Sequence, residues 1–450
     1  SIEKFIPIKN KEVGIYSCGP TVYHYAHLGN LRAYVFADVL RRMFVQSGFT
    51  VKHIINITDV GHLVGDGDSG EDKMQKGAER EGKTAWDVAK FYTDAYFTDL
   101  EVLNIPRDAY LFPRATDNIP EQITIISKLE EKGYTYKISD GIYFDTSKFS
   151  HYPDFAKLDV KGLQSGARVE ENTEKKNITD FALWKFSPIN ETRHMEWDSP
   201  WGKGFPGWHI ECSAMSEKYL GKHFDLHTGG IDHIPVHHTN EIAQSECAND
   251  ETYVNYWMHV NFLNDKRGKI AKSSGDFLRL QTLREEGISP LSYRYYLLTT
   301  HYRAEISFSI DAVKASAQAY EKLVTWCKEH TQTTGTVSEK YKTQFESMIH
   351  DDVNTPQVIA LIWTLMKDYN VDGGDKYATF LYIDEVLGLG LKDIVKVELT
   401  IGDDIKELLT KRDEARLNKN FAESDRLRDE IAKHGFIVKD TPNGQELSKS

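Results

Sequence analysis

The chain has 450 residues, well beyond the roughly 250 to 300 at which a single hydrophobic core stops growing, so two to four domains are expected. Apolar residues make up 40% and charged residues 27% of the chain, as in globular proteins, which excludes a disordered chain. A net charge of −13 argues against non-specific binding to nucleic acid, so a nucleic-acid partner would need local basic patches.

The N-terminal part has the pattern of a parallel α/β unit. Residues 13–17 (VGIYS) and 51–57 (VKHIINI) predict two short strands, and apolar residues between them recur at helical spacing until Gly48. A strand, helix and strand at this spacing form a βαβ unit, whose parallel strands place ligands at their carboxyl ends. We therefore expect a Rossmann-like α/β catalytic domain with residues 18–30 in the crevice loop.

The middle of the chain changes character twice. Residues 73–103 predict helices, and Thr116 predicts the cap of a further helix that ends at Gly133. In residues 134–200, aromatic strands such as DGIYFD alternate with charged loops, which indicates an insertion with its own fold. The main sheet is expected to resume near residue 205.

The C-terminal third is predicted to be helical. Beyond residue 311 few strand signals occur, and Asp352 with Thr355-Pro356 marks the start of an apolar helix. A helical bundle fits this pattern. In residues 401–450 one helix of mixed charge is expected to lead to a short strand, FIV, as a small separate unit.

The compartment is expected to be the cytoplasm. The longest nearly apolar run, 358–366, is less than half the roughly 20 residues that a membrane-spanning helix needs, and no targeting segment opens the chain. Four cysteines are too few for a disulfide scaffold and fit a reducing compartment. They are then core residues, nucleophiles or metal ligands.

Two nucleotide-binding patterns are present. Gly65, Gly67 and Gly70 satisfy the dinucleotide fingerprint, but the acidic residues among and after them would repel a pyrophosphate, so a solvated loop is favoured. Residues 77–84 (GAEREGKT) match the phosphate-binding P-loop, and 380–385 (FLYIDE) could serve as its magnesium-binding strand.

The P-loop interpretation is the main competitor from another class. It requires an apolar strand before the loop, whereas the preceding EDKMQK is charged and helix-like. Glu79 and Glu81 inside the loop also oppose phosphates. If it held, the chain would be a nucleotide hydrolase that depends on Lys83 and ignores amino acids.

Two other motifs carry a family resemblance. Residues 18–23 (CGPTVY) and 27–30 (HLGN) stand where the first strand meets the first helix, a place suited to phosphates. This resembles the first signature of class I aminoacyl-tRNA synthetases, usually HIGH, and 269–273 (KIAKS) resembles the second, usually KMSKS. The resemblance implies four catalytic residues: His27, Asn30, Lys269 and Lys272. It also implies that ATP is bound by His27, Gly29, Asn30 and Lys272.

The chemistry explains the need for these residues. Attack of a carboxylate on the α-phosphate of ATP builds negative charge, which positioned donors and lysines stabilise. The sequence departs from both signatures at Asn30, Ile270 and Ala271. Asn30 can still donate a hydrogen bond, whereas Ala271 removes a hydroxyl that would anchor the second loop.

A metal site makes the resemblance more specific. His237 and Glu241 are four residues apart, so a helix places both on one face, and thiolate, imidazole and carboxylate all bind zinc. From these residues alone, a coincidence of two distant cysteines with a His–Glu pair stays open. Together with their surrounding motifs, Cys18, Cys212, His237 and Glu241 resemble the four zinc ligands of the cysteinyl-tRNA synthetases.

That resemblance implies how the substrate is selected. One zinc ion would expand its coordination to take the cysteine thiolate, and serine would be rejected without an editing domain. Asp232 would pair with the α-ammonium. Trp208, one helical turn before Cys212, could equally be a core aromatic. The resemblance implies four pocket residues in all: Thr58, Trp208, His227 and Asp232.

Other positions in these segments keep a plainer interpretation. Cys247 and Cys327 match no ligand position and are expected to be core thiols. The loop GGIDHIPVHHTNE departs from the family pattern at several places, including His233 and Thr239, but keeps the ligand positions.

The resemblance covers essentially the whole chain. DDVNTP at 351–356 begins a helical domain like that of the family, and 401–450 resembles the anticodon-contacting end. A solvated helix face is as good an interpretation of the last unit as RNA contact, because its basic residues alternate with acids. These basic residues are Lys411, Arg412, Arg416, Arg426, Arg428 and Lys433.

The implied activity is ligation of cysteine to tRNA(Cys) with ATP and Mg²⁺, by a chain that we expect to be a monomer with no membrane contact. A ligase that joins cysteine to an amino sugar resembles the same core but typically lacks the last unit, and a non-catalytic RNA-binding module is a third alternative. The expected domains are a catalytic domain in two halves (1–110 and 201–260), an inserted connective region (111–200), a signature-loop and stem-contact region (261–310), a helical bundle (311–400) and the C-terminal unit (401–450).

Overall fold

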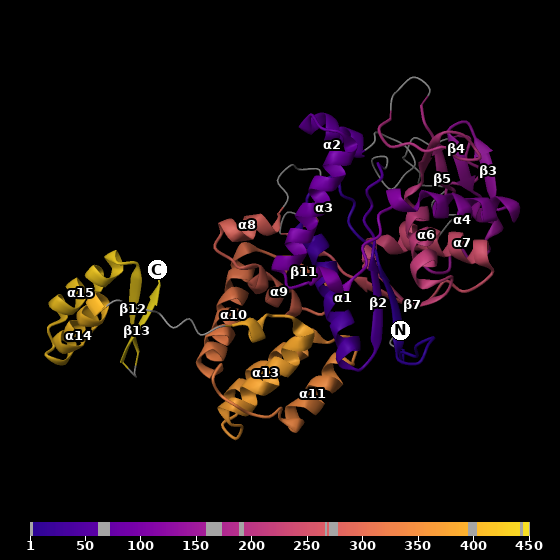
Figure 1. Cartoon of the computed structure of the whole chain (residues 1–450). Helices are drawn as coiled ribbons and strands as arrows, with labels where there is room; N and C mark the ends of the chain where they lie inside the picture. The colour runs from indigo at the N-terminus through magenta and orange to yellow at the C-terminus, as the bar shows by residue number, and fades with distance from the viewer. Residues whose placement is uncertain are drawn as a thin grey trace. The chain divides into compact units, whose positions relative to one another are not determined.

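The computed structural model describes most of the chain: residues 3–61, 73–158, 173–188, 193–265, 268–269, 278–394, 403–441 and 444–449. The chain divides into two compact units, residues 1–393 and 394–450, drawn in Figure 1. Within the described ranges, no helix combines the length and the apolar character needed to cross a membrane.

A four-stranded parallel sheet forms the centre of the first unit (Figure 1). Its strands, in spatial order, are β2 (Thr50–Ile55), β1 (Glu12–Ser17), β7 (Phe224–Gly230) and β8 (Val254–Val260). The chain leaves β1 for β2 in one direction and β7 for β8 in the other, so the sheet has a topological switch point between β1 and β7. The predicted α/β fold with a parallel sheet is confirmed.

Three helices cover this sheet: α1 (Leu28–Gln46), α6 (Trp208–Leu220) and α7 (Thr239–Asn249). Right-handed crossovers that run in opposite directions place α1 and α7 on opposite faces, as Figure 1 shows. α1 ends just before Gly48, whose φ of 83° suits a residue without a side chain. The helix predicted between the first two strands is therefore confirmed.

The inserted segment forms a second, antiparallel sheet that packs on α4 (Ile119–Glu131). Its strands are β3 (Thr135–Ile138), β4 (Gly141–Phe144), β5 (Phe181–Phe186) and β6 (Gly204–Pro206). The strand predicted in DGIYFD is β4. Because β6 pairs with β5, the expectation that the main sheet resumes near residue 205 is wrong, and it resumes at Phe224.

The predicted cap at Thr116 is also wrong. α4 begins at Ile119, and the Thr116 hydroxyl instead donates to Asp59 Oδ2 over 2.8 Å. Asp59 is almost completely buried, and a buried carboxylate requires hydrogen-bond donors. The Thr116 hydroxyl therefore bonds to Asp59 and does not cap the helix.

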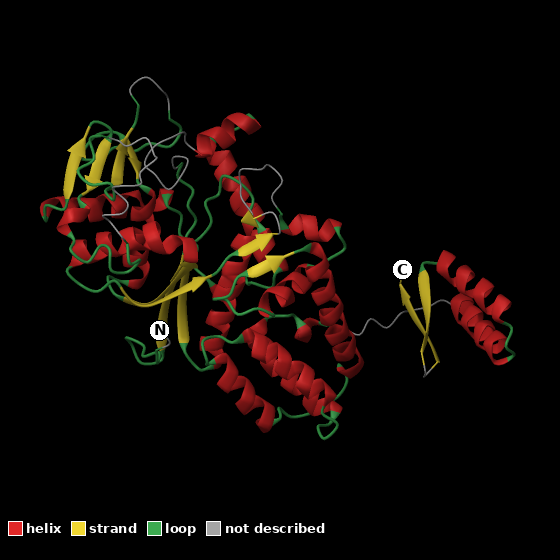
Figure 2. Cartoon of the chain, turned by 180° about the vertical axis from the view of Figure 1, so that it is seen from behind, coloured by secondary structure: helices red, strands yellow, loops and turns green. Residues whose placement is uncertain are grey.

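The remaining part of the first unit is mainly helical, as Figure 2 shows. Its helices are α2 (Lys73–Glu81), α3 (Ala85–Val102), α8 (Leu280–Glu285), α9 (Pro290–Leu298), α10 (Ile310–His330), α11 (Glu339–Ile349), α12 (Thr355–Lys367) and α13 (Gly373–Leu387). A small sheet contains β9 (Leu263–Asp265), β10 (Gly268–Lys269) and β11 (Ile306–Phe308). The apolar helix predicted to start at Thr355-Pro356 is α12.

A buried ion pair joins three of these helices. Arg294 on α9 and Asp38 on α1 are both fully buried, with 2.5 Å between Nη2 and Oδ2. Arg294 also donates to the carbonyl of Leu387 at the end of α13 and to that of Leu103. Burial alone would raise the pKa of Asp38, but the charges of Arg294 and Arg42 lower it overall.

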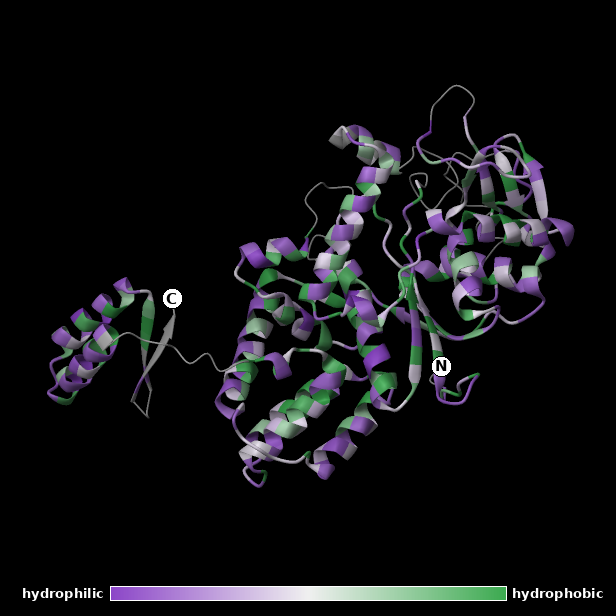
Figure 3. Ribbon diagram, viewed as in Figure 1, coloured by the Kyte–Doolittle hydropathy of each residue, from purple (hydrophilic) through white to green (hydrophobic). Residues whose placement is uncertain are grey.

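The described residues of the second unit form two helices and a pair of antiparallel strands: α14 (Asp403–Leu417), α15 (Phe421–Lys433), β12 (Phe436–Thr441) and β13 (Gly444–Lys449). The single helix expected here is wrong, because Lys419 adopts a φ of 55° and the Asn420 side chain caps a new helix. Both helices are largely hydrophilic, in contrast to α13 (Figure 3).

Replacing Arg294 by Met should lower the free energy of unfolding by about 3 to 5 kcal/mol, because it leaves the Asp38 carboxylate buried without its main partner. Urea unfolding followed by fluorescence measures the change. The matched control is Lys90→Met, which breaks the exposed Lys90–Asp94 pair and should cost less than about 1 kcal/mol. Equal losses in the two variants would contradict this role of the buried pair.

Candidate metal centre and active site

The first signature motif lies at the start of α1. His27 is the N-cap: its Nδ1 accepts from the backbone N–H of Asn30 over 3.1 Å, and Asn30 Oδ1 accepts from the N–H of His27. A side chain at Gly29 would lie 3.0 Å from the His27 ring. Asn30 therefore closes a reciprocal cap that holds the imidazole at the helix N-terminus.

The second signature lies mostly outside the described residues. Ile270, Ala271 and Lys272 are outside the described residues. Lys269 lies in β10, where only its backbone is described. The segments on either side are held by α1: the N–H of Leu28 donates to the carbonyl of Leu278 over 2.9 Å.

Arg32, one turn along α1, holds the preceding segment. Its guanidinium donates to the carbonyls of Asn261 and Phe262 over 2.7 Å each, just before β9. It also donates to the carbonyls of Tyr302 and Ala304. Sequence reasoning missed Arg32, because a single arginine in an amphipathic helix predicts a solvated residue and not a buried one.

The four predicted metal ligands converge. One ligand atom from each of Cys18, Cys212, His237 and Glu241 lies within 4.8 Å of the other three. Cys18 follows β1, Cys212 lies on α6 and Glu241 on α7. His237 lies in a π-helical turn before α7, and its Nε2 is 3.1 Å from Glu241 Oε1. π-helical turns are frequent at functional sites.

The electrostatics of this cluster suit a cation. Burial raises the pKa of Cys18 well above its usual value, whereas a hydrogen bond from Cys18 lowers the pKa of Cys212 to about 7. Burial raises the pKa of Glu241, but the charge of His227 and its hydrogen bond lower it overall. Two sulfurs, an imidazole and a carboxylate, three of them at most 3% exposed, form a donor set that fits Zn²⁺.

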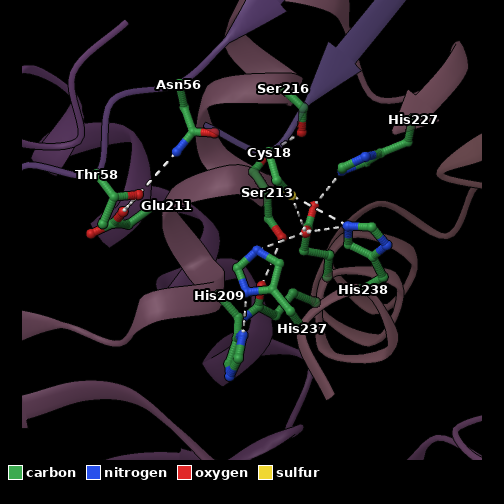
Figure 4. A network of polar contacts seen from close by, with 12 residues as sticks. Cys18, Asn56, Thr58, His209, Glu211, Ser213, Ser216, His227, His237 and His238 are labelled. Atoms are coloured by element: carbon green, nitrogen blue, oxygen red, sulfur yellow. Dashed lines mark hydrogen bonds and ion pairs between the residues drawn. The ribbon is translucent and has the colours of Figure 1, made fainter. Parts of the chain in front are cut away.

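Three further histidines surround the cluster. His209 Nδ1 lies 2.9 Å from His237 Nδ1, and His238 Nε2 lies 3.3 Å from Cys18 Sγ (Figure 4). His238 Nδ1 in turn contacts His259 Nε2 over 2.8 Å. None of the three was predicted from the sequence, although the position of His238 three residues before Glu241 is a usable signal.

A second donor set overlaps the first. Ligand atoms of Cys18, His227, His238 and Glu241 also lie within 4.8 Å of one another. His227 Nε2 lies 2.9 Å from Glu241 Oε2, and its ring stacks on Trp257. His227, predicted to line the amino-acid pocket, thus lies directly against a predicted metal ligand.

The other predicted pocket residues border the same cluster. The Trp208 ring lies 4.7 Å from that of His237, between centroids. Asp232 lies in the turn after β7, and its charge helps to raise the pKa of Cys18. Thr58, 2% exposed, donates to Glu211 Oε2 over 3.0 Å. Cys247 and Cys327 are buried elsewhere.

The P-loop interpretation is wrong. Residues 77–81 belong to α2 and so cannot form a phosphate-binding loop, and residues 380–385 lie within α13 and not on a strand. The Lys83 ammonium lies 4.8 Å from the centroid of the Phe91 ring. The glycines of the dinucleotide pattern, Gly65, Gly67 and Gly70, lie outside the described residues.

Known proteins match the chain along nearly its whole length. The family model of the tRNA synthetases class I (C) catalytic domain matches residues 4–318, and that of the cysteinyl-tRNA ligase anticodon binding domain matches residues 400–447. Cysteine–tRNA ligase 1 of Burkholderia lata is 48% identical over 99% of this chain and 94% of its own length. Cysteine–tRNA ligase of Treponema denticola is 41% identical over 97% of this chain and 95% of its own length.

Solved structures share the fold at low identity. Mycobacterium tuberculosis methionyl-tRNA synthetase with methionyl-adenylate has a TM-score of 0.55 at 14% identity, covering 86% of this chain and 92% of its own. The LeuRS–tRNA–LeuAMS complex of Agrobacterium radiobacter K84 has a TM-score of 0.60 at 11% identity, covering 87% of this chain and 85% of its own. With the relatives and both family models, the resemblance seen in the sequence is confirmed, and the chain belongs to the cysteinyl-tRNA synthetase family.

Proposed function

We propose that the chain activates cysteine with ATP to give cysteinyl-adenylate and pyrophosphate, and then transfers the cysteinyl group to the 3′-terminal adenosine of tRNA(Cys). The observation that carries this proposal is the convergence of Cys18, Cys212, His237 and Glu241 at the sheet edge where His27 caps α1. ATP and the amino acid would meet there, at the carboxyl ends of parallel strands.

We assign the activation step to donors at that edge. The cysteine carboxylate attacks the α-phosphate, and pyrophosphate leaves with Mg²⁺. His27, Gly29 and Asn30 at the N-terminus of α1 would bind the phosphates, supported by the helix dipole. Lys272, with Lys269, would stabilise the charge that develops on the transferring phosphate.

We assign the amino-acid pocket to the cluster and its border. Cys18, Cys212, His237 and Glu241 would hold one zinc ion, which supplies a soft Lewis acid that favours a thiol over a hydroxyl. Asp232 would pair with the α-ammonium, while Trp208, Thr58 and His227 would shape the pocket.

The C-terminal unit favours a tRNA acceptor over an amino sugar, because residues 400–447 match an anticodon-binding domain. Of the six basic residues considered there, Arg412 fits neither a solvated face nor RNA contact, because it is fully buried between Asp440 and Gln445. The exposed cations left for contact include Arg416, which also pairs with Asp440.

Amino-acid-dependent exchange of labelled pyrophosphate into ATP tests the function. Exchange should occur with cysteine and not with serine, should be lost after removal of zinc by a chelator, and should return when zinc is added. If the metal-replete protein hydrolysed ATP regardless of cysteine and gave no exchange, the proposed function would be wrong.

Replacing Lys272 by Ala should slow this exchange by about 10² to 10³-fold, because one positioned charge is lost from the developing transition state. The KM for cysteine and the bound zinc should stay unchanged. Lys83→Ala is the matched control and should exchange at the wild-type rate, because residues 77–81 of the P-loop pattern lie within α2. Unchanged exchange by the Lys272 variant would remove that lysine from the mechanism.

His209 should tune the metal site. Nδ1 of His237 lies 2.9 Å from His209 Nδ1, so if Nε2 held the metal ion, Nδ1 would carry the proton and would donate it to His209. We expect His209→Phe to weaken zinc binding about 10 to 100-fold, measured by competition with a chromophoric chelator. His209→Asn, whose amide oxygen can accept the same proton, should retain most of the affinity; equal losses would point to packing instead.

A further inference from the structure

Three buried side chains outside the donor set connect the two segments that carry the cysteines. Asn56 Oδ1 accepts from the backbone N–H of Gly19 over 2.8 Å, and Asn56 Nδ2 donates to Thr58 Oγ1 over 3.0 Å. The Thr58 hydroxyl then donates to Glu211 Oε2 over 3.0 Å. Figure 4 shows Asn56, Thr58 and Glu211 in this sequence beside Cys18. We call these three side chains the strut.

The ends of the strut lie next to the two thiols. Gly19 follows Cys18 directly, and Glu211 directly precedes Cys212. The backbone adds to the first attachment, because the N–H of Thr58 donates to the carbonyl of Pro20 over 3.0 Å. A side chain on Gly19 would overlap the carbonyl oxygen of Asn56, so a residue without a side chain is needed where the loop after β1 meets the segment after β2.

The strut is buried, and each of its links has one donor and one acceptor. Asn56, Thr58 and Glu211 are at most 2% exposed. Water cannot replace a lost partner there without a cavity, so removal of the Thr58 hydroxyl takes the acceptor from the buried Nδ2 of Asn56. The hydrogen bonds therefore resist displacement of the start of α6 relative to the loop after β1.

We propose that Asn56 and Glu211, linked through Thr58, are positioning residues that hold Cys18 and Cys212 at the spacing that a metal ion requires. This proposal rests on the zinc site of the proposed function. The two cysteines come from segments far apart in the sequence, so a site made from them needs a rigid connection outside the ligand atoms.

Zinc affinity of the full-length apoprotein tests the strut without using catalysis. Chelator competition should show that Thr58→Val, which is isosteric but lacks the hydroxyl, binds zinc about 10 to 100-fold more weakly than wild type. Asn56→Ala should lose a similar factor. Thr58→Ser keeps the hydroxyl and should bind within about threefold of wild type, as expected for effects outside the ligands. With cobalt in place of zinc, the thiolate-to-metal charge-transfer band should weaken in the first two variants.

Asn118→Ala is the matched control. Asn118 is also fully buried and accepts from Lys218 Nζ over 2.8 Å, so it tethers α6 at its other end. This variant should keep wild-type zinc affinity. Equal losses of zinc affinity in the Asn118 and Asn56 variants would mean that the strut contributes only to general stability. Unchanged zinc affinity in Thr58→Val would overturn the proposal. If Asn56→Ala does not fold, the Thr58 pair decides. Zinc binding without cysteine-dependent exchange in the wild type would refute the proposed function and leave the strut intact.

Discussion

The carboxylate of Glu241 is the constraint on which the site depends. Its side chain is completely buried, and a buried charge costs several kcal/mol unless partners compensate it. It receives hydrogen bonds from His227 Nε2 over 2.9 Å and Tyr253 OH over 3.0 Å, and lies 3.1 Å from His237 Nε2. These partners come from β7, the loop before β8 and the π-helical turn, so compensating one charge sets the position of α7 against the sheet.

The parallel sheet brings the other half of the site to the same edge. β1 and β7 are neighbours whose crossovers diverge, which leaves their carboxyl ends open to a ligand. Cys18 follows β1 directly, and its N–H donates to the carbonyl of Thr228 on β7. α1 begins beyond the same loop. The thiol, the capped helix and the buried carboxylate are therefore brought together by topology, although 223 residues separate Cys18 from Glu241.

Local patterns predicted the elements whose energetics are local, such as β1, α1 and α12. They failed where a distant partner decides: β6 pairs with β5, and Asp59 takes the Thr116 hydroxyl. Motifs likewise predicted the signature residues and the four metal ligands, whose ligand atoms the fold brings together. No sequence motif marks His209, Asn56 or Arg32. Each of them contacts a segment far away along the chain, and only the fold brings these contacts together.

The two overlapping donor sets differ in the types of ligand atom that they offer. They share Cys18 and Glu241, so an ion in one set excludes an ion in the other. His237 and His238 are placed alike, because each turns Nε2 to the cluster while its Nδ1 meets a further histidine, His209 or His259. The set with Cys212 and His237 also offers two sulfurs instead of one, and soft donors favour zinc. The donor chemistry therefore favours the set that the sequence motifs indicated.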